Sequence, residues 1–75
     1  MLIYMSELVF NVTQEDDGGY SAEAVGELIF TQGDTWKDLC SKVQEALQAH
    51  FYQDLKKKPQ KVHLHLVHDE ELLVA

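Results

Sequence analysis

The sequence is poor in the features that cross-link small proteins or anchor them in membranes. Cys40 is the single cysteine among 75 residues, so no intrachain disulfide can form. The chain shows no signal-peptide pattern, and its apolar runs are far shorter than the ~20 residues that a membrane-spanning helix needs. We therefore expect a cytoplasmic chain with no membrane partner, folded as a single domain over residues 1–75.

Basic side chains are also scarce. The chain has six basic and 13 acidic residues, which gives a net charge of -7. No basic residue precedes Trp36. Because nucleic-acid affinity depends mainly on neutralising phosphates with Lys and Arg, this acidic half disfavours direct binding of nucleic acid. Its field favours a small basic protein as partner, and the alternative is that the acidity only keeps the chain soluble.

The remaining composition is that of a folded domain, with 45% hydrophobic and 25% charged residues. A domain of this size buries only about 60% of the surface that its unfolded chain exposes. Association with a partner or with a second copy would therefore add stability. We expect a homodimer or a larger homo-oligomer.

Four segments have the pattern of β-strands. Apolar and polar residues alternate over residues 6–14, which predicts a half-buried strand that residues 2–5 either extend or leave frayed. Residues 20–24 and 61–67 alternate in the same way. Residues 28–31 are apolar on both faces, so we expect this third strand to be central and covered on both sides.

Turn residues separate these strands. Asp16, Asp17, Gly18 and Gly19 form the motif of a hairpin turn, because glycine adopts positive φ at little cost and Asp bonds to its local backbone. A second short turn is expected at residues 26–27. Residues 69–71 have the composition of a polar turn. Two alternatives follow for residues 72–74: they pair back as a short fifth strand, or the sheet has four strands.

One segment has helical periodicity. From Trp36 the apolar residues recur at spacings of three and four, which predicts an amphipathic helix to about residue 52–55. Thr35 is the expected N-cap, with Asp38 completing an approximate capping box, and Pro59 prevents further helix. The predicted fold class is α+β: two layers, in the order β-β-β-α-β, with one helix covering a mostly antiparallel sheet of four or five strands.

Two motifs carry a family resemblance. The chain resembles the HicB-like antitoxin family over about residues 6–55, in an Asp-x-Gly-Gly-Tyr turn followed by a Thr-x-Gly-Asp-Thr helix entry. The matching residues are Asp16, Gly18, Gly19, Tyr20, Thr31, Gly33, Asp34 and Thr35. The resemblance implies a partial ribonuclease-H-like fold, self-association and neutralisation of a small basic ribonuclease toxin, HicA.

The chain also departs from the pattern of that family. Asp38 stands where a Glu is usual in the first helical turn, and the segment between the second and third strands is shortened. No DNA-binding segment is expected after the fourth strand, so DNA binding is not carried over. The expected function is that of a stand-alone, non-catalytic protein-interaction module, without a cofactor.

The candidate partner-binding residues are mostly acidic and lie in or beside the first two strands. They are Glu15, Asp16, Asp17, Tyr20, Glu23 and Glu27. Carboxylates of this group could be taken for a ribonuclease-H-type magnesium site. The turn chemistry of Asp explains them better, and no basic groove lies nearby to hold nucleic acid, so we do not expect an enzyme.

An alternative function uses histidine. His63 and His65 share one face of the predicted fourth strand, about 7 Å apart along it, and His68 follows. Three such side chains could bind a metal ion or a small ligand. The simpler interpretation is that the histidines cover the polar face of the sheet. Cys40 and Trp36 are interpreted as core residues rather than as a nucleophile and an interface anchor.

Overall fold

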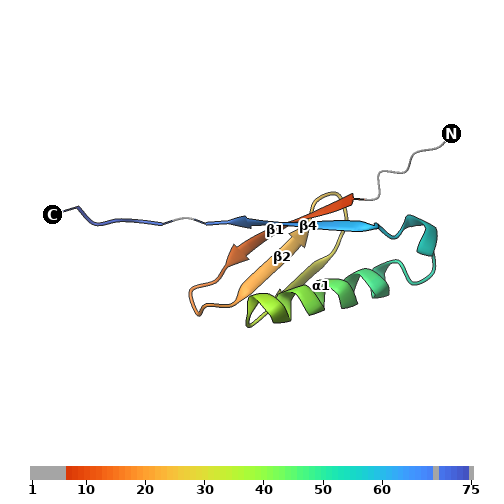
Figure 1. Ribbon diagram of the computed structural model, residues 1–75, viewed down its shortest axis with the longest axis horizontal. Coiled ribbons are helices and arrows are strands. Elements are labelled where there is room, and N and C mark those ends of the chain that lie inside the picture. The colour runs from red at the N-terminus through yellow and green to blue at the C-terminus, as the bar shows by residue number, and fades with distance from the viewer. Residues whose placement is uncertain (1–6, 69, 75) are drawn as a thin grey trace.

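The computed structural model describes residues 7–68 and 70–74. The predicted strand start at residue 6 and the alternatives for residues 2–5 lie outside this part of the chain. The elements follow the predicted order (Figure 1): β1 (Glu7–Gln14), β2 (Tyr20–Ala24), β3 (Phe30–Gly33), α1 (Trp36–His50), the 3-10 turn η1 (Leu55–Lys57) and β4 (Lys61–Val67).

The strands form one sheet in the order β3-β2-β1-β4. The β1–β2 and β2–β3 pairs are antiparallel, whereas β4 pairs with β1 in parallel, with Phe10 opposite Leu64. The connection from β1 to β2 is short enough for a hairpin, whereas the return to β4 includes α1, as a parallel pair requires. The predicted two-layer α+β fold with a mostly antiparallel sheet is confirmed.

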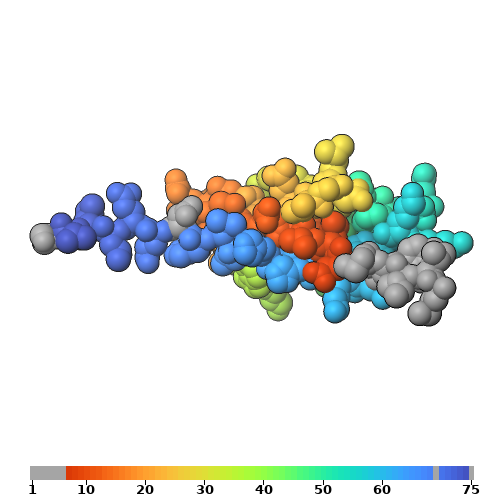
Figure 2. All heavy atoms as spheres, turned by 90° about the horizontal axis from the view of Figure 1, so that it is seen from above, coloured from red at the N-terminus to blue at the C-terminus, as the bar shows by residue number. Residues whose placement is uncertain are grey.

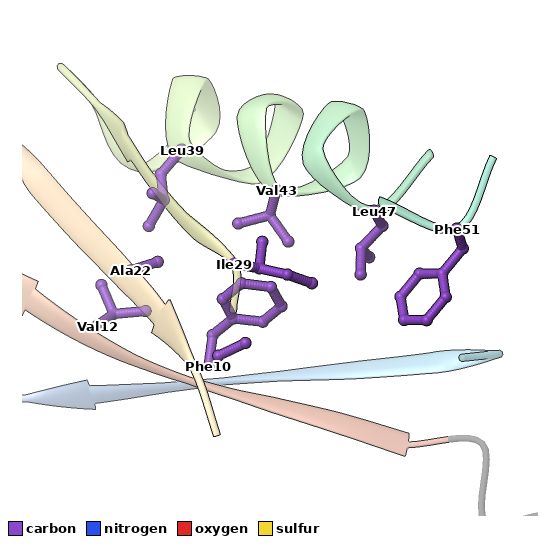
Figure 3. Close-up of a cluster of buried hydrophobic side chains, with 9 residues drawn as sticks. Phe10, Val12, Ala22, Ile29, Leu39, Val43, Leu47 and Phe51 are labelled. Atoms are coloured by element: carbon purple, nitrogen blue, oxygen red, sulfur yellow. The ribbon is translucent and has the colours of Figure 1, made fainter. Parts of the chain in front are cut away.

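The hydrophobic core lies between α1 and one face of the sheet (Figure 3). Phe10 and Val12 of β1 and Leu39 of α1 are completely buried. Alanines on β2 leave room for the helix to approach. The other buried residues of the core are Ala22, Ala24, Ile29, Val43, Leu47 and Phe51.

Local hydrogen bonds explain where α1 begins. The hydroxyl of Thr35 accepts a hydrogen bond from the backbone N–H of Asp38 at 3.0 Å, which confirms Thr35 as the N-cap. The carboxylate of Asp38 accepts in turn from the backbone N–H of Asp34 at 3.0 Å. The capping box therefore closes one residue earlier than its usual form, in which the N-cap residue itself donates.

The predicted position of the third strand is wrong. β3 runs over Phe30–Gly33 rather than residues 28–31, and it forms an edge of the sheet instead of its centre. Leu28 and Phe30 are 98% and 65% exposed, whereas Ile29 is buried. An apolar run is compatible with either a central strand or an exposed corner, and strand pairing decides between them.

Two other boundaries differ from the predictions. α1 ends at His50 rather than at about residue 52–55; residues 51–53 form a turn, and η1 follows at Leu55–Lys57. Residues 70–74 form no strand, so the predicted fifth strand over residues 72–74 is absent from the described part of the chain. These residues instead continue away from the body of the molecule (Figure 1).

Candidate partner-binding surface

The hairpin between β1 and β2 brings several of the predicted carboxylates together. Gly18 has φ +92°, in the left-handed region that favours glycine, and its N–H donates to the carbonyl of Glu15 at 2.9 Å. The carboxylate of Asp17 accepts from the N–H of Gly19 at 2.9 Å, and that of Glu15 accepts from the hydroxyl of Ser21 at 2.7 Å. These bonds hold the two acidic side chains near the start of β2.

Strand pairing places Asp34 and Asp38 beside Glu15 and Asp17. Tyr20 at the start of β2 lies opposite Gly33 at the end of β3, so the hairpin turn and the entry to α1 are neighbours. Together they line a hollow of about 360 Å³. We call it the acidic hollow, and its lining residues are Glu15, Asp17, Gly19, Tyr20, Gln32, Gly33, Asp34, Asp38 and Lys42.

Close packing at Gly33 makes this arrangement possible. A Cβ atom at Gly33 would lie 2.5 Å from the backbone nitrogen of Leu39, closer than such atoms approach in proteins. The absence of a side chain lets the first turn of α1 press against the end of β3. The ring of Trp36 then packs edge-on against Tyr20, with 5.3 Å between ring centroids. Trp36 remains 39% exposed, so it borders the core without being buried in it.

The structure divides the six predicted partner-binding residues among three places. Glu15, Asp17 and Tyr20 line the acidic hollow. Asp16 lines a neighbouring hollow together with Glu15 and His68. The remaining two, Glu23 and Glu27, lie toward the other end of β2, beside the exposed apolar side chains of Leu28 and Phe30.

Two carboxylates of the acidic hollow were not among the predicted site residues. Asp34 and Asp38 flank the N-cap of α1. The sequence assigns Asp38 to helix capping and Asp34 to the helix-entry motif of the family resemblance. The place of Asp34 in the same motif as Gly33, with Asp38 one helical turn further on, was the signal that could have identified them. Only the register of β2 and β3 shows that this motif faces the hairpin.

His63 and His65 lie close together, but His68 lies apart from them. The rings of His63 and His65 stack with their centroids 6.4 Å apart. They lie on the sheet face opposite α1, whereas His68 lines a hollow with Asp16 and Gly18. Within residues 7–68 and 70–74, no three His, Cys, Asp or Glu side chains are grouped so that they could hold a metal ion.

Two further residues depart from simple sequence expectations. Cys40 is half-buried on the side of α1. His50, at the end of α1, lies 3.3 Å from a carboxylate oxygen of Glu27, and both side chains are partly exposed. This contact joins the end of the helix to the turn between β2 and β3.

No helix in the described part of the chain is long and apolar enough to span a membrane.

Comparison with known proteins identifies the family. The chain is 37% identical to a UPF0150 protein of Thermotoga maritima over 68 residues, which cover 91% of this chain and 93% of that relative. It is 40% identical to a UPF0150 protein of Archaeoglobus fulgidus over 43 residues, 57% of this chain and 65% of the relative. No protein-family model and no solved structure matches the chain. The chain belongs to the UPF0150 family, whose name specifies no activity.

Proposed function

We propose that this chain is a HicB-like, non-catalytic protein-interaction module that binds a small basic protein, of the HicA toxin type, and associates with itself. The observation that carries the proposal is the meeting of the two resemblance motifs in the acidic hollow. Gly19 and Tyr20 of the first motif and Gly33 and Asp34 of the second line the same surface.

The charge of the hollow suits such a partner. Four carboxylates surround it and one lysine, Lys42, lies at its margin. Neighbouring carboxylates on an exposed surface attract lysine and arginine side chains over a distance set by ionic strength, about 10 Å at 0.1 M salt. The same field repels the phosphates of nucleic acids, so the partner is a protein rather than RNA or DNA.

The test neutralises the hollow without breaking its hydrogen bonds. Asn and Gln keep the acceptor oxygens that Asp17 and Glu15 use in the turn. The triple variant Glu15→Gln/Asp17→Asn/Asp34→Asn therefore removes three charges and keeps the local fold. The matched control removes three exposed charges elsewhere, with the substitutions Glu7→Gln, Glu45→Gln and Asp54→Asn.

Tagged chain is expressed in its native host, and the captured basic protein is purified and titrated against each variant. We expect the hollow variant to bind it at least tenfold more weakly than the control at low salt, with the difference shrinking at high salt. Capture of no basic protein, or equal affinity for both variants, contradicts the proposed partner binding.

A further inference from the structure

Among the residues that the structure describes, the outer edge of β4 is an unpaired strand edge. β4 is a seven-residue strand at the edge of the sheet, and β1 occupies one of its sides. In the described part of the chain, no strand pairs with its other side. An exposed edge of this length presents a row of free N–H and C=O groups that can template pairing with another chain.

The helix leaves the apolar side chains of β4 incompletely covered. α1 packs chiefly against β3 and β2, at the other side of the sheet. Val62, Leu64 and Leu66 share the core face with Leu8, Phe10 and Val12, their register partners on β1. Val62 and Leu64 are half-buried, and Leu66 is 42% exposed. This apolar row is open toward the free edge.

A strand-like arm continues from β4. Residues 70–74, here called the arm, extend beyond the sheet in the line of the strand (Figures 1 and 2). Leu72, Leu73 and Val74 of the arm are 77%, 94% and 92% exposed. Three consecutive apolar side chains are unfavourable in water, in proportion to the apolar surface that they expose. A surface that covers them would therefore be stabilised by the contact.

We infer that the β4 edge and the arm bind a second copy of this chain, in an antiparallel β4–β4 pairing that joins two sheets into one. This inference rests on the self-association in the proposed function and specifies its interface. The two copies are related by a two-fold axis, and the register pairs all seven residues of each β4. Leu64, the central residue of the strand, then lies opposite Leu64 of the second copy. The same register sets Val62 opposite Leu66 on the same face, so the two open apolar rows cover each other.

Charge complementarity supports a second copy as the occupant. In this register the line of each arm runs past the start of β4 of the other copy, where Lys56, Lys57 and Lys58 precede the strand. Because the chain before Lys61 leaves the strand through the 3-10 turn η1, Glu70 and Glu71 approach Lys57 and Lys58 as a basic group rather than as strand-paired residues. Four of the six lysines of the chain lie between residues 56 and 61, so the acidic start of each arm reaches the most basic segment of an acidic protein.

A cysteine experiment tests the register. In an antiparallel pair, residues opposite each other have Cα atoms about 4.5–5.5 Å apart, within the range that a disulfide spans. In a Cys40→Ala background, Leu64→Cys should form a covalent dimer on oxidation. Val62→Cys should not, because the two copies of residue 62 are offset by four positions, about 13 Å along the strands. Equal cross-linking of both variants, or of neither, overturns this register.

A charge exchange tests the arm at Glu70, Glu71 and Lys57, which are exposed, and at Lys58, which is half-buried. It leaves Leu64 unchanged, so it tests the interface even where Leu64→Cys fails to fold. We expect Glu70→Lys/Glu71→Lys to weaken the dimer about tenfold in sedimentation equilibrium at low salt, because two attractive charge contacts of each arm become repulsive. Adding Lys57→Glu/Lys58→Glu should restore wild-type affinity. The matched control adds Lys37→Glu/Lys42→Glu instead, which restores the net charge at the wrong place and should leave the dimer weak.

The outcomes separate this inference from the function on which it rests. If the wild-type chain sediments as a monomer at every concentration, self-association fails and the interface fails with it. If the chain self-associates and the two four-site variants behave alike, the β4 interface is wrong and self-association stands. Binding of the basic partner is measured in a separate titration, so its result depends neither on self-association nor on the β4 interface.

Discussion

At the scale of the residue, the fold depends on a few positions where a small change has a large steric or electrostatic effect. Gly33 is the clearest of them, because its missing side chain allows the backbone of α1 to contact the end of β3. Asp38 combines two roles, since its backbone N–H is capped by Thr35 and its carboxylate binds the N–H of Asp34. The acidic hollow is thus built partly from groups that also stabilise the helix entry.

Replacing Gly33 tests this packing. Gly33→Ala places a Cβ atom 2.5 Å from the nitrogen and 2.7 Å from the Cα atom of Leu39, so the helix must shift. We expect the free energy of unfolding to fall by about 1–3 kcal/mol in urea denaturation, the usual effect of overpacking. Gln32→Ala is the control, because Gln32 is exposed on the same strand and its truncation creates no steric overlap. A larger loss in the control would contradict the proposed role of Gly33.

At the scale of the element, burial distinguishes apolar residues that stabilise the fold from those that are available to a partner. α1 contributes Leu39, Val43 and Leu47 to the core, each within 5% exposure. β3 and the preceding turn carry Leu28 and Phe30 at the surface. These residues have equal hydrophobicity in the sequence and opposite environments in the structure.

Truncating one buried and one exposed apolar residue compares their contributions to the free energy of unfolding. Leu39 is completely buried between α1 and the sheet, so Leu39→Ala should cost about 2–5 kcal/mol of stability through lost burial and a residual cavity. Phe30→Ala, at a side chain that is 65% exposed, should cost under about 1 kcal/mol. Both changes are read from chemical denaturation. A comparable loss for the two variants would show that the edge strand is packed more tightly than its exposure indicates.

At the scale of the whole molecule, the chain combines a small core with an extended outline. Its radius of gyration is 14.9 Å, against about 11 Å for a compact domain of this length. The longest dimension is 60 Å and the other two are 25 and 19 Å, because the arm projects from the sheet (Figure 2). A molecule of this outline has much surface for its volume, which favours association.

Association of this kind makes stability depend on concentration. A partner that binds only the folded chain raises the free energy of unfolding by mass action. We expect a tenfold increase in protein concentration to raise the Tm of the wild-type chain by about 3 °C, in line with the steep dependence of Tm on stability in small domains. The shift should be smaller for Glu70→Lys/Glu71→Lys over the same concentrations. A Tm independent of concentration would contradict self-association.

Much of the fold could be predicted from local patterns. The alternation in β1, β2 and β4, the helical spacing after Trp36 and the cap at Thr35 depend on neighbouring residues, so they were visible in the sequence. The edge position of β3 was not, because an apolar segment such as residues 28–30 reads the same whether another strand or solvent lies beside it. The predicted partner-binding residues were correctly placed in turns and strands, but their division among three surfaces depends on how those strands pair.

The sequence by itself determined the order of the elements, the alternating faces of β1, β2 and β4, and the acidic character of the first half of the chain. It did so because backbone periodicity, capping and charge are properties of adjacent residues. Only the tertiary structure decided which strands form the edges, and it alone joined Asp34 and Asp38 to Glu15 and Asp17 in one hollow. Those contacts arise from the pairing of Tyr20 with Gly33, which brings together residues that are distant along the chain.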